Sequence, residues 1–380
     1  MGFTWYQYAS RLPLAKNLGK VRTATAAPLP AQDQKTVERI RQETLAHNRD
    51  NIDRTRAYLS FYQKHPQIHW ALLAHLVSRN AGWSMTDLRG ELLPRLLRTK
   101  EQQDYFSFLE RGNWLIFHDA YPQLLLYEES VRRQTNLFYI LPHLGVSTFM
   151  QAIWNHFWKT TDKELLTIGL IINEQNYLEE QVMKEPAYQN SVVRTIPFAL
   201  QELLQLNMIL LPHRKVADEQ GSSLQLAGER VFHFASLLER ISLGKRLYSL
   251  LFGGQKRQEA AYSWALEQPH TGSRKDYWPH LFHDVNNTAP GKPYQVKLMN
   301  CQLRSEAKRL FSPTLRQVWR PVHHEPPKEL DWYKSKSDVW RVLTQAEETA
   351  NVAEMSEAYC QALTKIEWAV AARTRILKTL

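Results

Sequence analysis

The chain has 380 residues, of which 43% are hydrophobic and 23% are charged, so it can bury a sizeable core and does not have the composition of a disordered protein. Its 48 Lys and Arg residues exceed its 38 Asp and Glu residues, which gives a net charge of +10. Residues 241–320 alone carry +8 of that excess. Such a concentration of positive charge predicts an anionic partner for this stretch.

Several classes of protein are disfavoured by what the sequence lacks. The two cysteines are far apart and form no CxxC motif, which excludes a thiolate zinc site and a thioredoxin-type motif. No apolar run approaches the roughly 18 residues that span a bilayer. Residues 1–22 lack the continuous apolar segment of a signal peptide. We therefore expect a cytoplasmic protein with no transmembrane segment, and the sparse cysteines favour the same compartment.

The first part of the chain predicts an arm followed by helices. Residues 1–35 contain three prolines and predict an N-terminal arm outside the core. Side chains spaced by three and four over residues 36–62 predict one long helix. Residues 68–80 are apolar nearly all round and predict a buried helix that ends at Gly82. The capping pattern at Ser84 then predicts the start of another helix.

The remainder of the chain continues the helical pattern and then loses it. Residues 209–227 are polar and predict either a loop or a small hairpin. Prolines recur after residue 269, with one helix predicted over 295–311, and a helical stripe from Val352 to Val370 predicts a final helix that docks on the core. The other predicted helices, joined by short connections that suit antiparallel packing, span residues 103–110, 120–134, 143–158, 162–183, 190–207, 228–251 and 255–267.

These elements predict an all-α fold in three parts. Residues 1–35 form the arm, residues 36–270 form a multi-helix core domain, and residues 271–380 form a basic, partly irregular C-terminal region that is closed by the final helix. The helical stripes fit a monomer and an oligomer equally well, so the oligomeric state stays open.

Three segments carry a resemblance to a known family. Residues 47–90, which begin HNRDNIDRTRAYLSFYQ, and the segments FHDAYPQLLLYE and GSRKDYWPHLF resemble the bacterial YppC-like family of unknown function. The similarity runs over most of the chain. The resemblance implies a bacterial, cytoplasmic protein, and it implies no catalytic residues because no activity comes with the family.

Polar residues interrupt the first two predicted helices and form the first candidate site. Buried polar groups must be hydrogen-bonded, so they predict either a network that fixes the register of the helices or a pocket for a polar or anionic ligand. The network is the commoner outcome for such residues. The candidates are Asn48, Asn51, Thr55, His69, His75, Arg79 and Asn80.

Metal and acid–base chemistry have weaker candidates. His280, His283 and Asp284 cluster locally but do not complete a ligand set, so we predict no metal site. Glu180 would share a helix face with Asn173 and could act as a general acid or base, although a solvated helix face is the commoner explanation.

Motifs for bound cofactors are missing. No dinucleotide loop and no P-loop is present, so the cofactor stays unknown.

Asp119 is well placed to cap the helix predicted over residues 120–134.

Cations and aromatic residues interleave after residue 270 and form the second candidate site. Cations contact phosphates, and aromatic rings stack on bases or lie at a lipid interface. The alternative is a basic solvated surface with its aromatics packed inward. The candidate anion-binding residues are Arg274, Lys275, Trp278, Lys297, Arg304, Lys308, Arg309, Arg316 and Arg320.

Two classes of function follow from these two sites. The first is a binding protein whose basic region takes an anionic partner, either nucleic acid or an acidic membrane surface, and the charge distribution favours it. The second is an enzyme or small-ligand-binding protein with its pocket between the early helices. Whether the protein is an enzyme stays open, because no catalytic motif in the chain specifies a reaction.

Overall fold

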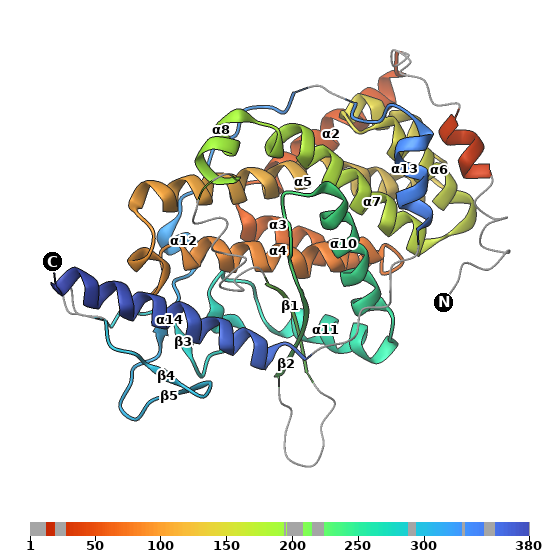
Figure 1. Cartoon of the computed structure of the whole chain (residues 1–380). Helices are drawn as coiled ribbons and strands as arrows, with labels where there is room; N and C mark the ends of the chain where they lie inside the picture. The colour runs from red at the N-terminus through yellow and green to blue at the C-terminus, as the bar shows by residue number, and fades with distance from the viewer. Residues whose placement is uncertain are drawn as a thin grey trace.

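The computed structural model describes residues 13–19, 28–193, 195, 208–214, 224–287, 294–328, 331–345 and 354–379. These residues are mostly helical, with a few short strands among them (Figure 1). The predicted multi-helix architecture is therefore confirmed, and the small sheets correct the all-α assignment. No helix in this part of the chain is both long and apolar enough to cross a membrane.

The helices from α2 to α7 follow one another with short connections, whereas longer stretches separate several of the later ones. In the first half they are α2 (Ala31–His47), α3 (Asn51–Lys64), α4 (His69–Asp87), α5 (Thr99–Arg133), α6 (Thr148–Thr160) and α7 (Lys163–Leu178). In the second half they are α8 (Pro186–Tyr188), α10 (Leu237–Phe252), α11 (Gln255–Glu267), α12 (Leu315–Val318), α13 (Lys336–Thr344) and α14 (Ser356–Thr379).

Short turns and strands complete the described elements. The 3-10 turns are Leu93–Arg95, Phe138–Leu144 and Arg274–Asp276, and the π-helical turns are Glu179–Met183 and Gln189–Val193. The strands are β1 (Met208–Arg214), β2 (Leu224–Arg230), β3 (Phe282–His283), β4 (Leu298–Met299), β5 (Gln302–Leu303) and β6 (Leu310–Phe311). β1 pairs antiparallel with β2 and β4 with β5, whereas β3 and β6 run parallel.

Helix α4 lies at the centre of the fold. Its apolar side chains are buried on all sides, with Trp70, Leu76 and Trp83 at most 1% exposed. In Figure 1, α5 and α7 pass above α4, and the β1–β2 hairpin and α14 lie below it. Helix α3 packs along its length. A helix that is apolar nearly all round has no solvent-facing side, which explains this central position.

The long helix predicted over residues 36–62 is two helices. The chain leaves the helical conformation at Asn48 and resumes it at Asn51. The Asp50 side chain accepts a hydrogen bond from the backbone N–H of Asp53 at 2.9 Å, and this cap starts α3. The spacing of apolar residues continues across the break, so the spacing does not reveal it.

Helix α4 continues past the predicted stop at Gly82 and ends at Asp87. The glycine is needed for a close approach rather than for a cap. A Cβ atom there would overlap the amide oxygen of Asn51 and the Nε2 atom of His270. Ser84 accordingly lies inside the last turns of α4 and starts no helix.

Two predicted helices, 103–110 and 120–134, are parts of one helix, α5. Asp119 is therefore an interior residue that is 5% exposed, and it does not cap a helix. Pro122 also lies inside α5. Tertiary packing overrides the local preference here, because Leu115, Phe117 and Leu124 along the same helix are fully buried.

The predictions for the middle of the chain agree better with the structure. Helices α6, α7 and α11 lie within or close to the ranges 143–158, 162–183 and 255–267, whereas the helix predicted over 228–251 begins only at Leu237, as α10, and residues 228–230 belong to strand β2. Of the two structures predicted for residues 209–227, the structure shows the hairpin, with Leu210 opposite Gly228 in its register. The helix predicted over residues 190–207 lies mostly outside the described residues.

The helix predicted over residues 295–311 is wrong. The chain forms the β4–β5 hairpin there and then enters β6. Asn300 and Cys301 adopt the left-handed conformation, with φ of 49° and 66°, which makes the tight turn. Cys301 is disulfide-bonded to Cys360 of α14, so this hairpin is linked covalently to the final helix. The predicted final helix is confirmed as α14.

The predicted arm and the predicted core meet in space. Residues 13–19 are helical, and their Leu14 and Leu18 are buried in the same apolar cluster as Trp70. Leu281 and Leu310 from beyond residue 270 belong to that cluster too. The boundaries at residues 35 and 270 stay predictions, and side chains from all three segments share one core.

Candidate functional site

Asn51 lies at the centre of a buried hydrogen-bond network between α3 and α4. Its amide nitrogen donates to the backbone oxygen and to the hydroxyl of Ser78, both at 3.0 Å. Its amide oxygen lies 2.8 Å from Nε2 of His270. The other ring nitrogen of His270 is 3.4 Å from the carboxylate of Asp276, which also accepts a hydrogen bond from the Trp83 indole. The network therefore joins the early helices to the C-terminal region.

Arg79 and His75 are buried beside this network. Arg79 donates to the backbone oxygen of Gln268 at 2.8 Å, and its guanidinium lies 4.2 Å from the centre of the Trp264 ring. Burial lowers the pKa of Arg79 to about 10. His75 is 2.7 Å from the backbone oxygen of Thr55, and burial, together with the charge of Arg79, lowers the pKa of His75 to about 3. His75 is therefore uncharged at neutral pH.

The other candidates of the early helices are separated from one another. Asn48 donates to the backbone oxygen of Trp114, and Thr55 to that of Asn51. His69 stacks on Phe252, with ring centres 4.0 Å apart. Asn80 exchanges hydrogen bonds with the backbone of Leu210 in β1. Of the seven candidates, Asn80 is the one that borders the cavity described next.

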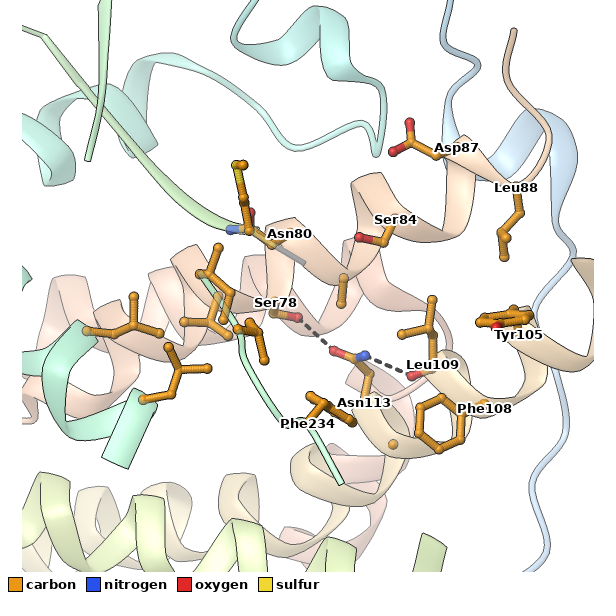
Figure 2. A pocket seen from close by; sticks show the side chains of 18 of the residues that line it. Ser78, Asn80, Ser84, Asp87, Leu88, Tyr105, Phe108, Leu109, Asn113 and Phe234 are labelled. Atoms are coloured by element: carbon orange, nitrogen blue, oxygen red, sulfur yellow. Dashed lines mark hydrogen bonds between the residues drawn. The ribbon is translucent and has the colours of Figure 1, made fainter. Parts of the chain in front are cut away.

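A cavity of about 390 Å³ lies next to α4. Its walls come from α4, α5, α7, α10, β1 and α14, together with residues near β3 and β6. Figure 2 shows the part of the wall that α4 and α5 supply. Most of the lining is apolar, including Leu73, Val77, Leu88, Phe108, Leu109, Ile116, Ile171, Leu178, Met183, Phe234, Leu243, Leu247, Leu363 and Ile366.

Uncharged polar groups form a short row on one wall of the cavity. Ser78 and Asn113 face each other from α4 and α5 in Figure 2, and the serine hydroxyl lies 3.5 Å from the amide oxygen of Asn113. The Asn113 amide nitrogen donates to the backbone oxygen of Leu109 at 2.8 Å. Ser84 lies further along α4 on the same wall. A few placed polar groups within an apolar lining are typical of small-molecule sites.

The cations of the lining are neutralised by acids. Arg274 forms an ion pair with Asp87 at 2.6 Å, and Arg240 forms one with Glu179 at 2.6 Å. A third acid, Glu91, lies 3.1 Å from the ammonium of Lys297. These pairs fix the charged side chains at the edges of the cavity.

Glu174 of α7 is the acid of the lining that has no such partner among the described cations. Its carboxyl accepts hydrogen bonds from the Trp70 indole at 3.2 Å and from the Gln175 amide at 3.3 Å. Burial raises the pKa of Glu174 to about 8, and the nearby carboxyl of Asp119 acts in the same direction. Burial also raises the pKa of Asp119 itself, to about 7.

Replacing Glu174 by glutamine is expected to stabilise the protein increasingly as the pH rises. The folded-state pKa of about 8 lies above the ordinary value of 4.5, so the folded state holds a proton that the unfolded state has released. The wild-type free energy of unfolding therefore falls as the pH rises between these values. Urea unfolding at pH 5 and pH 8 should show the gain of the variant growing by about 1 kcal/mol or more. A gain that does not change with pH would contradict the assignment.

In the polar run after residue 172, the acid that faces inward is Glu174 rather than Glu180. Glu180 forms an ion pair with Lys184 near the surface, whereas Glu174 and Asn173 face inward. Glu180 lies in the π-helical turn Glu179–Met183, which follows α7, and its side chain is half-buried beside Lys184. A signal for Glu174 was present, because it lies two residues after the end of the apolar run at Ile172.

Half of the basic candidates are engaged within the protein. Lys275 pairs with Asp284 at 2.7 Å, and Arg316 reaches Asp50 and Asp53, both at 2.8 Å. Arg274 and Lys297 are paired as described above, and the buried Trp278 packs on Tyr359 with ring centres 4.9 Å apart. Arg316 is nevertheless exposed, as are the candidates Arg304, Lys308, Arg309 and Arg320. The predicted helix that placed three of these on adjacent turns is absent.

The histidine cluster has structural contacts. His283 lies 2.7 Å from the backbone oxygen of Arg309, and His280 packs on Trp278 with ring centres 5.4 Å apart. Within the described ranges, no three His, Cys, Asp or Glu side chains are grouped so that they could hold a metal ion.

Comparison with known proteins places the chain in a family. Residues 46–360 match the family described as "Protein of unknown function (DUF2515)", and the chain belongs to this family. Among its relatives is the "Uncharacterized protein YppC" of Bacillus subtilis (strain 168), which is 44% identical over 243 residues, 64% of this chain and 73% of the relative. The resemblance to a YppC-like family is thus confirmed. No solved structure matches the chain.

Proposed function

We propose that this protein binds an apolar or amphipathic small molecule in the cavity beside α4. The observation that carries the proposal is a cavity of about 390 Å³ with a mostly apolar lining and a short row of polar groups. Protein interiors are close-packed, and voids larger than a water molecule are few. Ligand sites are concave, mostly apolar and of this order of size.

Binding of an anionic macromolecule stays a prediction and ranks second. Its support is the group of exposed cations Arg304, Lys308 and Arg309 near the β4–β5 hairpin. Arg309 also donates to the backbone oxygen of Pro279, and Arg304 to that of Leu298. Because other candidates of this stretch form internal ion pairs, less of its charge is available to a partner than its composition indicates.

Gly112 of α5 allows a direct test of the cavity. A Cβ atom there would meet only Leu178, 3.8 Å away, so a larger side chain at this position would extend into the cavity without straining the helix. The Gly112→Phe variant is expected to bind the uncharged dye N-phenyl-1-naphthylamine at least about tenfold more weakly than the wild type. Dye fluorescence during titration measures both affinities.

The control adds the same ring outside the cavity. Gln103 lies on the exposed side of α5, and a Gln103→Phe variant should bind the dye as the wild type does. Far-ultraviolet circular dichroism checks that both variants are folded. Equal dye affinity in the wild type and in Gly112→Phe, or no binding by the wild type, would overturn the proposal.

A further inference from the structure

The cavity lining contains one acid more than its cations can neutralise. Among the described lining residues the acids are Asp87, Glu91 and Glu174, and the cations are Arg240 and Arg274. Each of the two cations already forms an ion pair with a carboxylate, and Glu91 forms an ion pair with Lys297. Glu174 is left with two uncharged donors, the Trp70 indole and the Gln175 amide.

We propose that the ligand of this cavity carries a basic nitrogen, and that Glu174 binds the resulting ammonium group while the apolar walls hold the attached hydrocarbon part. The inference rests on the proposed function, because it names the ligand class of the same cavity. A positive charge within hydrogen-bond distance of Glu174 would stabilise its carboxylate, for which the described lining residues supply no counter-charge. Charge-assisted hydrogen bonds of this kind are stronger than those between neutral groups.

The surroundings of Glu174 favour a cation over an anion. The Trp70 and Gln175 donors each use one acceptor position of the carboxyl, and a carboxylate offers about four, so acceptor capacity remains for a ligand in the cavity that all three residues line. Asp119 adds a second carboxyl nearby, which would repel a ligand carboxylate and attract an ammonium. Arg240 of the lining donates to the side-chain oxygen of Gln175 at 3.0 Å, and it forms its ion pair with Glu179.

The protonation states are compatible with an ion pair. An alkylammonium group has a pKa of about 10, as the lysine side chain does. Burial raises the pKa of Glu174 to about 8, so at pH values between about 8 and 10 the carboxyl is ionised and the free amine is still protonated. The carboxyl gives up its own proton to solvent as the ammonium binds.

Three probes of equal chain length separate this inference from the proposed function. Calorimetric titration with n-octylamine, n-octanol and n-octanoate compares an ammonium, a neutral hydroxyl and a carboxylate on the same hydrocarbon. We expect octylamine to bind at least about tenfold more tightly than octanol, and octanoate to bind most weakly. The Glu174→Gln variant should bring the octylamine affinity down to that of octanol. A Glu180→Gln variant, altered nearby on the same helix outside the cavity, should keep the preference.

The outcomes are distinct. Equal binding of octylamine and octanol by the wild type, tighter binding of octanoate, or a preference that survives in Glu174→Gln would overturn the amine inference and leave ligand binding intact. Absence of binding by all three probes, together with absence of dye binding, would overturn the proposed function itself.

Discussion

Replacing Glu110 by glutamine is expected to lower the free energy of unfolding by about 3–5 kcal/mol, one of the two largest effects we predict. Glu110 and Arg54 form an ion pair at 2.5 Å between α5 and α3, and their side chains are 4% and 1% exposed. Arg54 also donates to the amide oxygen of Asn48 at 3.2 Å. The variant leaves the Arg54 charge buried without its counter-charge, which is the costly state. Equilibrium urea unfolding measures the change.

Two further variants identify the source of that loss. Glu128→Gln removes a carboxylate from the same helix, but its ion pair with Lys64 is exposed, so the loss there should stay below about 1 kcal/mol. The double variant Arg54→Met, Glu110→Leu removes both charges and should recover most of the stability. If Glu110→Gln is no less stable than Glu128→Gln, the buried pair does not have the role that we assign to it.

Loss of the disulfide between Cys301 and Cys360 should lower stability by a similar amount, about 4 kcal/mol, because the bond closes a loop with a sequence separation of 59 residues. The bond constrains the unfolded chain, and in the folded protein it ties the β4–β5 hairpin to α14. The variant Cys301→Ser, Cys360→Ser is the test, with unfolding followed in urea.

Reductant provides the matched control for this prediction. Addition of dithiothreitol should shift the unfolding midpoint of the wild type to that of the double serine variant and should leave the variant unchanged. Thiol titration of the oxidised, denatured wild type should find no free cysteine. Two free thiols under non-reducing conditions, or a variant as stable as the wild type, would contradict the bond's role.

The sequence predicts much of the helical architecture because hydrophobic spacing is a local property. Helices α7, α10, α11 and α14 follow their apolar stripes closely, and α4 is central because its sequence is apolar nearly all round. Helix boundaries also depend on tertiary contacts, which the spacing of hydrophobic residues does not reveal. Glycine often ends a helix, yet Gly82 lies within one. Its missing side chain allows Asn51 and His270 to approach its backbone closely.

The C-terminal region was harder to predict for the same reason. Its cations were treated as a free surface, but several of their partners are distant in sequence, as Asp87 is from Arg274 and Asp50 from Arg316. The pairing of Cys301 with Cys360 is also long-range. Two cysteines that are separated in sequence carry no sign that they will meet.

The candidate site was predicted only in part. The polar residues of the early helices were correctly noticed, and among them Asn80 borders the cavity. The cavity itself depends on segments from α4 to α14, so no single stretch of sequence contains it. Glu174 was not among the predicted site residues, and Glu180, for which a solvated helix face was the commoner explanation, pairs with Lys184 outside the cavity.

Photolabelling tests most directly the claim that a small molecule binds beside α4. The wild type is irradiated with an eight-carbon alkyl diazirine, and the labelled peptides are identified by mass spectrometry. We predict labels on the cavity walls of α4, α5 and α7, and their loss in Gly112→Phe. Labels that lie instead on exposed apolar residues such as Phe232 and Trp368, and that persist in Gly112→Phe, would contradict the claim.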